Sequence, residues 1–342
     1  GLLVVVGQNG LILSSVDGEV WTLREHGLAD NLRSVTWSPL HNRFVAVGLS
    51  QTVLVSDDGL DWNAQVTGAD FDLYDVICVI DDDTLCLAVG SGGTILASSD
   101  GVIWSLRRSG GDDVLRSITH RDGANELFVA VGDNGRVLLS SDAVTWDSLN
   151  ATVHHLHHVT TSPELLVAVG RSGTIVTSED GAVWARVPNL GTSEHFHSVA
   201  WSGSAFVAVG DSGIVAIAQG DQSPAWDTVR IASEPFLQDV FWNDTIFIAV
   251  GEQGTIFTSP NGSDWTEQLW DVPAEQLKGL NAVGSSGSLY VAVGIDLTII
   301  SSGDATEWIG RGQAASGSLE GVTWTGTRFV AVGLDNIIVT SP

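Results

Sequence analysis

The 342-residue sequence is short of several residue types, and each shortage narrows its possible functions. Lysines and arginines number 14 against 41 aspartates and glutamates, which gives a formal net charge of −27. Such a negative surface repels nucleic-acid phosphates and anionic membranes, so neither is an expected partner. No hydrophobic run reaches the roughly 20 residues of a transmembrane helix, so membrane insertion is not expected. Methionine is absent and the chain begins with Gly1, so we expect a mature or trimmed product whose missing signal peptide leaves its location open.

A Val-Gly pair recurs about every 41 residues along the whole chain, with no helical pattern between the copies. This period is typical of a β-propeller, in which each repeat forms one four-stranded blade. In one copy we expect strands at 32–38, 44–48 and 52–56, and a fourth strand that carries Trp62. We therefore predict an all-β fold with a single propeller domain over residues 1–342. The glycines of the nine pairs are Gly7, Gly48, Gly90, Gly132, Gly170, Gly210, Gly251, Gly294 and Gly333.

The ends of the chain bear on the number of blades. The sequence begins in a second strand and stops after a third strand. It therefore holds nine hairpins of second and third strands, but eight first strands and eight fourth strands. An eight-bladed ring would leave one apolar hairpin unplaced, and its exposed surface would cost about 25 cal/mol per Å². We therefore favour nine blades and keep eight as the alternative.

A second motif, Ser-x-Asp-Gly-x-x-Trp, follows most of these hairpins, as in Ser56, Asp58, Gly59 and Trp62. One copy, which ends at Trp226, is degenerate. A short aspartate accepts hydrogen bonds from backbone N–H groups two residues on, and the tryptophan fills space between blades. Because these turns lie on separate blades, their carboxylates do not converge on one site. We therefore interpret the motif as structural.

These motifs resemble the Asp-box (BNR repeat) of sialidase-like propellers, although this box is one residue shorter. The pairing of "VAVGxxGTIxxS" with "DGxxW" resembles propellers of the photosystem II assembly-factor type and their bacterial relatives. The resemblance covers essentially the whole chain and implies the propeller fold.

Two cysteines replace a cross-strand pair of the repeat. Trp201 lies opposite Phe206 around a two-residue turn, and the same alignment places Cys78 opposite Cys86. We predict a Cys78–Cys86 disulfide, with two buried free thiols as the alternative. A disulfide places the protein outside the reducing cytosol, so we expect it to be extracellular, cell-surface or periplasmic.

Aligning the repeats singles out one variable polar position near the start of each first strand, directly after an apolar residue. Variation on a constant scaffold is typical of a binding face, although solvated polar residues would give the same pattern. The residues at this position, which we call the ring residues, are Arg33, Tyr74, Arg116, His157, His197, Gln238, Asn281 and Glu320. Trp270, in the longest connection between repeats, is a further candidate for partner or sugar contact.

Histidines are concentrated in two neighbouring repeats, in "HHLHH" (154–158) and "EHFH" (194–197). The alignment matches His155 with His195 and His157 with His197, so four imidazoles could face one another. Such a set suits zinc, copper or nickel, or forms a pH-sensitive patch or an exposed polar loop. Otherwise no cofactor is expected.

The sequence lacks a recognisable catalytic set. A sialidase resemblance implies an arginine cluster and a tyrosine nucleophile, but only Arg33 and Arg116 flank Tyr74. We therefore expect a non-enzymatic, secreted or surface-exposed scaffold that binds a protein partner or assembles with itself. The alternatives are a glycan-binding or glycan-cleaving module and a metal-binding propeller.

Overall fold

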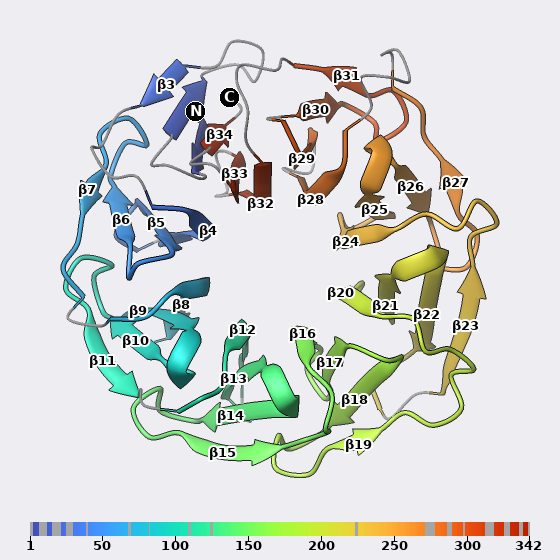
Figure 1. The fold of residues 1–342 in the computed structure, drawn as a ribbon, viewed down its shortest axis with the longest axis horizontal. Helices are drawn as coiled ribbons and strands as arrows, with labels where there is room; N and C mark the ends of the chain where they lie inside the picture. Colours follow the sequence, from blue (N-terminus) through green and yellow to red (C-terminus); the bar gives the residue numbers. More distant parts are fainter. Residues whose placement is uncertain are drawn as a thin grey trace.

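The strands form a ring of antiparallel sheets around a centre (Figure 1). The computed structural model describes residues 3–6, 12–15, 22–24, 30–38, 40–67, 70–81, 83–108, 111–123, 126–222, 225–270, 278–285, 289–296, 298–311, 318–324, 329–334 and 338–340. Among the described residues there is no helix with the length and apolarity needed to span a membrane.

Among the described strands, seven sheets are four-stranded blades, each built from four consecutive strands. The inner strands are β4 (Leu32–Ser38), β8 (Leu73–Asp81), β12 (Leu115–Arg121), β16 (Leu156–Thr161), β20 (Phe196–Trp201), β24 (Leu237–Trp242) and β28 (Leu280–Ser285). The second strands are β5 (Arg43–Gly48), β9 (Asp83–Gly90), β13 (Leu127–Gly132), β17 (Leu166–Gly170), β21 (Ala205–Gly210), β25 (Phe247–Gly251) and β29 (Tyr290–Gly294).

The two remaining strands of each blade lie farther from the centre. The third strands are β6 (Val53–Ser56), β10 (Ile95–Ser98), β14 (Arg136–Ser140), β18 (Thr174–Ser178), β22 (Ile214–Gln219), β26 (Ile256–Ser259) and β30 (Ile299–Ser302). The outer strands are β7 (Asn63–Ala64), β11 (Ser105–Arg108), β15 (Asp147–Asn150), β19 (Ala185–Arg186), β23 (Trp226–Arg230), β27 (Thr266–Glu267) and β31 (Ile309–Gly310). Short 3₁₀ turns follow four second strands, at η2 (Ser91–Gly93), η3 (Asp133–Gly135), η4 (Asp211–Gly213) and η5 (Glu252–Gly254).

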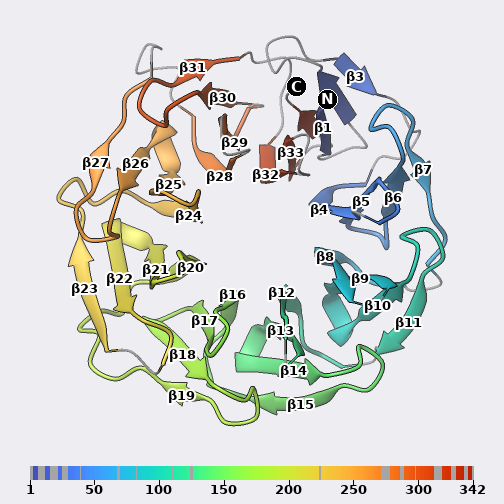
Figure 2. The ribbon, with the colours of Figure 1, turned by 180° about the vertical axis from the view of Figure 1, so that it is seen from behind.

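The predicted number of blades, nine or eight, is wrong, because the described part of the structure forms seven four-stranded blades. Both ends of the chain instead share one six-stranded sheet, in which β1 pairs with β34 (Figures 1 and 2). Two hairpins that the sequence count assigned to separate blades thus lie edge to edge. The six strands are β1 (Leu3–Val6), β2 (Ile12–Ser15), β3 (Thr22–Arg24), β32 (Ser318–Trp324), β33 (Phe329–Leu334) and β34 (Ile338–Thr340).

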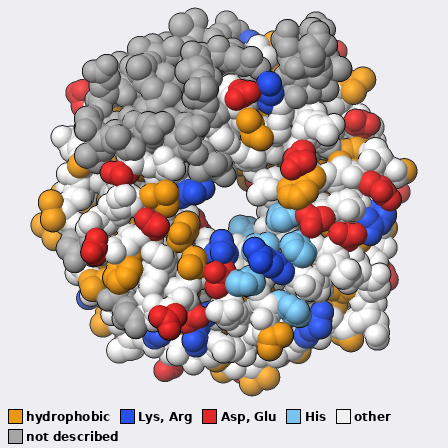
Figure 3. All heavy atoms as spheres, viewed as in Figure 1, with side chains coloured by type: hydrophobic (Ala, Val, Ile, Leu, Met, Phe, Trp, Pro, Cys, Tyr) orange, Lys and Arg blue, Asp and Glu red, His pale blue; other side chains and the backbone are white. Residues whose placement is uncertain are grey.

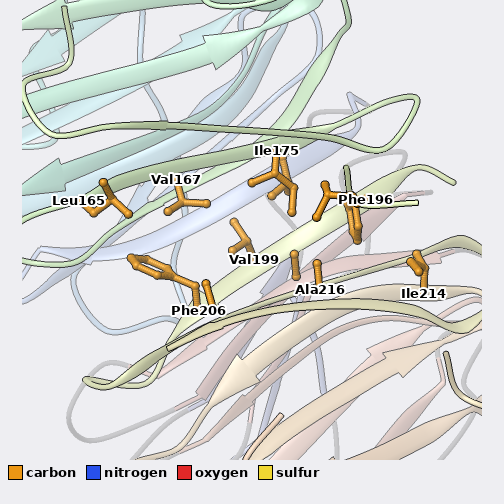
Figure 4. Close-up of a cluster of buried hydrophobic side chains, with 12 residues drawn as sticks. Leu165, Val167, Ile175, Phe196, Val199, Phe206, Ile214 and Ala216 are labelled. Carbon is orange, nitrogen blue, oxygen red and sulfur yellow. The ribbon is translucent and has the colours of Figure 1, made fainter. Parts of the chain in front are cut away.

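The hydrophobic core lies between neighbouring blades. Every residue of β21 is buried, because this second strand is covered on both faces. Between the blades of β17 and β21, Val167 and Ile175 pack toward Phe196 and Phe206 (Figure 4). Burial of such side chains stabilises the ring by about 1.5–3 kcal/mol each. The ring is therefore a rigid support for groups at its centre.

The Ser-x-Asp-Gly-x-x-Trp turns have a structural geometry. In one of them, the Asp142 carboxylate accepts the backbone N–H groups of Val144 and Thr145, both at 2.8 Å, and the Ser140 hydroxyl at 2.9 Å. In another, the Trp104 indole N–H donates to the carbonyl of Gly101 at 2.9 Å, and the ring is buried. These carboxylates bind their own turns.

These turns should make the protein sensitive to acid. The backbone N–H groups of Thr145 and Val144 hold the pKa of Asp142 well below its usual range. The pKa values of the equivalent Asp58, Asp100, Asp180 and Asp304 are lowered as well. A lowered folded-state pKa contributes stability that is present above the unfolded value of about 3.9 and is lost as pH falls below it. We therefore expect the melting temperature to fall steeply below about pH 4.

Asp142→Asn tests this expectation, because the chain already has an asparagine in one such turn. Asn261 accepts the N–H groups of Ser263 and Asp264 at 2.9 Å each without a titrating group. The variant should melt like the parent at pH 7 and lose less melting temperature in acid. Thermal unfolding followed by circular dichroism from pH 7 to pH 2.5 measures both. An unchanged acid dependence would contradict the assignment.

The predicted disulfide is confirmed. Cys78 in β8 and Cys86 in β9 are bonded, with 4.0 Å between their Cα atoms. The three additional residues of this repeat extend the hairpin beyond the cysteines, to the pair Asp81 and Asp83, and leave the cysteine register intact. The predicted aromatic pair is also present, with the rings of Trp201 and Phe206 centred 4.3 Å apart.

Candidate functional site

Each ring residue lies in a β-bulge, where the inner strand has one residue more than its neighbour. In β12, Leu115 pairs with Gly132 and Ser117 with Val131, so that Arg116 has no partner in β13. The same register shift occurs in every other inner strand and in β32, where it falls at Glu320. Bulges re-aim a side chain out of the regular alternation. The variable position of the alignment therefore coincides with the bulged residue of each inner strand.

The Val-Gly motif holds each bulge in place. The N–H of Asp133, the residue after Gly132, donates to the carbonyl of Val114 at 2.8 Å. This bond brings the turn after β13 against the chain that enters β12. A Cβ atom on Gly132 would overlap the same carbonyl oxygen, so the site admits only glycine. The equivalent contact joins Gly48 to Asn31, Gly90 to Asp72, Gly170 to His155, Gly210 to His195, Gly251 to Phe236 and Gly294 to Gly279.

The bulged residues surround a cavity of about 340 Å³ at the centre of the ring. Arginine and histidine side chains gather on one side of this hollow (Figure 3). The structure thus brings together seven of the eight ring residues, one from each four-stranded blade. They are Arg33, Tyr74, Arg116, His157, His197, Gln238 and Asn281. The side chain of Glu320 lies outside the described part of the structure.

A second belt of polar side chains, one residue after six of the bulges, forms much of the cavity wall. Asp75 accepts the backbone N–H of Ile118 in the next blade at 2.9 Å, and His158 Nδ1 accepts that of Val199 at 3.3 Å. Inner strands have no neighbour on their central side, and this belt satisfies their free N–H groups. This belt was not predicted from the sequence. The signal was present, because this position holds Ser34, Asp75, Ser117, His158, Ser198 and Asp239 in six consecutive repeats.

The two carboxylates of this belt are unusual. Asp75 accepts the Ser34 hydroxyl at 2.9 Å in addition to its backbone donors, and Asp239 accepts that of Ser198 at 2.7 Å. Burial raises the pKa of both carboxyl groups, and this effect exceeds the opposing effect of their hydrogen bonds and of His158. Their oxygens are therefore committed to the scaffold.

Four ring residues are engaged within the protein. Arg116 makes a two-bond ion pair with Asp133, at 2.6 and 3.1 Å, and His197 lies 2.6 Å from Asp211. His157 contacts the carbonyl of Phe196 at 3.1 Å. Asn281 donates to the Ser318 hydroxyl at 2.8 Å and to a backbone carbonyl of β32.

The other three ring residues in the cavity have no polar partner in the described part of the structure. Arg33, Tyr74 and Gln238 make no hydrogen bond or ion pair with any described residue, and Arg33 Nε is buried. The pKa of Tyr74 is raised, mainly by burial, so its hydroxyl stays protonated at neutral pH. These groups are available to a ligand.

The predicted four-histidine metal site is not assembled. His157 and His197 stack with their ring centres 5.5 Å apart and their planes 4° apart. His155 lies instead 2.8 Å from Asp133, and His195 lies 3.9 Å from Asp211. Among the described side chains, no group of three or more histidines, cysteines, aspartates or glutamates is placed to hold a metal ion. Burial, together with the charge of His197, lowers the pKa of His157 to about 4, so this imidazole is neutral at pH 7.

Trp270 does not join the cavity. Its side chain is only 9% exposed and packs in the core with Trp308 and Tyr290. Its indole N–H donates to the carbonyl of Gly254 at 3.0 Å. The extra tryptophan thus contributes to packing between blades.

The cavity holds two of the arginines that a sialidase-like site requires. Arg33 and Arg116 are the arginines among the described residues that line it, and Arg116 is already paired with Asp133. Burial raises the pKa of Tyr74, so at neutral pH its protonated hydroxyl can donate a hydrogen bond.

The fold and this site define a β-propeller with a polar cavity at the centre of its ring. The structure of YCF48 from Cyanidioschyzon merolae is similar, with a TM-score of 0.56 at 17% identity over 76% of this chain and 91% of that one. YCF48 bound to a D1 peptide gives 0.59 at 17% identity, over 79% and 91%. Sqt1 from Chaetomium thermophilum gives 0.69 at 13% identity, over 88% and 94%. No protein-family model and no curated protein sequence matches the chain.

Proposed function

We propose that this propeller is a non-enzymatic scaffold that binds a segment of a protein partner in its central cavity. The observation that carries the proposal is the set of bulged residues, one per four-stranded blade, that meet around one cavity. A rigid ring supports them, and Arg33, Tyr74 and Gln238 have no hydrogen-bond or ion-pair partner among the described residues. A structure described as YCF48 bound to a D1 peptide offers a parallel for peptide binding on this fold.

We further propose that the protein works outside the reducing cytosol, as a secreted, surface-exposed or periplasmic protein. The disulfide between Cys78 and Cys86 supports this, because such bonds persist in oxidising compartments. Localisation of a tagged chain in its native cells tests the proposal. Recovery of the two cysteines as free thiols from intact cells would contradict it.

Selection from a displayed library of random peptides tests the proposed binding site. The selected peptides should bind the parent protein and lose at least about tenfold in affinity with the triple variant Arg33→Ala, Tyr74→Phe, Gln238→Ala. The matched control is Arg107→Ala with Gln219→Ala, which changes two exposed residues away from the cavity. Fluorescence anisotropy measures each affinity. Peptides that bind the triple variant as tightly as the parent would place the binding surface elsewhere.

A further inference from the structure

Two hydrogen-bond donors of the cavity, on Arg33 and Tyr74, have no acceptor among the described residues. Arg33 on β4 carries a positive charge with no anionic partner among the described residues, and its Nε atom is buried. Tyr74, on the neighbouring inner strand β8, presents a protonated hydroxyl. Leaving a buried donor such as Arg33 Nε unpaired is costly, so a ligand that supplies acceptors to Arg33 gains free energy here.

The protein's own anions near the cavity are committed to other groups. Asp133 accepts both bonds from Arg116. Asp75, which follows Tyr74 in the chain, accepts the Ser34 hydroxyl and the backbone N–H groups of Val76 and Ile118. Among the described residues, therefore, no carboxylate competes with an incoming anion for Arg33.

Arg33 is the principal cation among the described residues that line the cavity. The charge of Arg116 is balanced by Asp133, and His157 is neutral at pH 7. Gln238, across the ring on β24, is an uncharged donor and acceptor that suits a peptide group. The cavity thus has a positively charged side at Arg33 and an uncharged polar side at Gln238.

We infer, building on the proposed function, that the bound segment presents a carboxylate, which pairs with the Arg33 guanidinium and accepts the Tyr74 hydroxyl. A planar guanidinium matches the two oxygens of a carboxylate, and a bond between charged partners is about twice as strong as a neutral one. The carboxylate comes either from an acidic side chain or from the end of a chain. Both have the same oxygen geometry.

Three short peptides separate these sources. They are acetyl-Gly-Glu-Gly-amide, acetyl-Gly-Gln-Gly with a free carboxyl end, and acetyl-Gly-Gln-Gly-amide as the uncharged control. Titrated into ¹⁵N-labelled protein, at least one carboxylate peptide should shift the resonances of Arg33 and its strand neighbours. The uncharged peptide should bind at least about tenfold more weakly. The peptide that binds more tightly identifies the source.

Variants locate the contact. Arg33→Gln should reduce the affinity for the carboxylate peptide at least about tenfold, and Tyr74→Phe should reduce it severalfold, while Arg107→Gln should leave it unchanged. Unaltered spectra away from the cavity show that each variant folds. Equal binding of charged and uncharged peptides, or full affinity in Arg33→Gln, would overturn the carboxylate inference.

The two proposals fail in different ways. If library-selected peptides need the ring residues but bind equally well after Glu→Gln and Asp→Asn replacement and amidation, peptide binding stands and the carboxylate inference falls. If no selected peptide depends on the ring residues, the proposed site itself falls. In that case the short carboxylate peptides should not bind at the cavity either.

Discussion

Replacing Gly132 with alanine is expected to destabilise the propeller by about 4 kcal/mol or more, in the range reserved for severe steric defects. The backbone at Gly132 is extended, which any residue can adopt, so the cause is crowding. The added methyl group would overlap the carbonyl oxygen of Val114 and the Cα of Leu115. These are backbone atoms, which cannot rotate out of the way as a side chain can. The chain at the Arg116 bulge would therefore have to move, and the hydrogen bond from Asp133 N–H to the Val114 carbonyl would be lost.

Gly303→Ala is the matched control for this prediction. A Cβ atom at Gly303 meets no other atom within 4 Å, so its unfolding free energy should stay within about 0.5 kcal/mol of the parent. Urea denaturation followed by tryptophan fluorescence measures both variants. If Gly132→Ala and Gly303→Ala unfolded at nearly the same urea concentration, the close approach of Gly132 to the Val114 carbonyl would not be the reason that the motif requires glycine.

The sequence predicted those parts of the molecule that repeat. The Val-Gly pairs recur because each four-stranded blade contains the same close backbone contact, which in one blade joins Gly132 to the carbonyl of Val114. Comparison of the copies also located the ring residues, because a position that varies is easy to recognise when the rest of the repeat is constant. The pairing of Cys78 with Cys86 followed from the same comparison, since strand register is shared between repeats.

Features that depend on more than one repeat could not be predicted from the sequence. The shared sheet of β1 and β34 depends on how the two ends of the chain meet, and a count of hairpins contains no such information. Matching positions in the repeat placed His155 beside His195, but each lies instead beside the carboxylate nearest to it, Asp133 or Asp211. Trp270 lies outside the repeat, so no other copy indicated whether its side chain was exposed or buried.

Replacing Asp239 with alanine is the second change for which we expect a large effect, a loss of about 2–4 kcal/mol of stability at pH 5. The Asp239 carboxylate accepts the Ser198 hydroxyl at 2.7 Å and the N–H groups of Val240 and Val283 at 2.8 and 3.2 Å. Alanine would leave three donors unpaired, and each buried unpaired donor costs about 1–3 kcal/mol. Water in the cavity offsets part of this cost.

Asp239→Ser separates the loss of these bonds from the loss of the side chain. Elsewhere in the belt a serine has the same role: Ser34 and Ser117 accept the N–H groups of Val76 and Val159 in the next blade, at 3.3 and 3.4 Å. The serine variant should therefore keep the acceptor for Val283 and fall between the parent and Asp239→Ala. Urea denaturation gives the order. Equal stability of the serine and alanine variants would exclude a role for the belt in joining blades.

The pH dependence of the Asp239→Ala loss should have the sign opposite to that of the turn aspartates. Because burial raises the folded-state pKa of Asp239, its contribution to stability is fully present below the unfolded value of about 3.9. That contribution diminishes as pH rises through the folded pKa, whereas the contribution of Asp142 is lost as pH falls. The stability difference between the parent and Asp239→Ala should therefore be larger at pH 4.5 than at pH 7.5. A difference that grows with pH would mean that the hydrogen bonds of this carboxylate outweigh its burial, which would reverse the inferred direction.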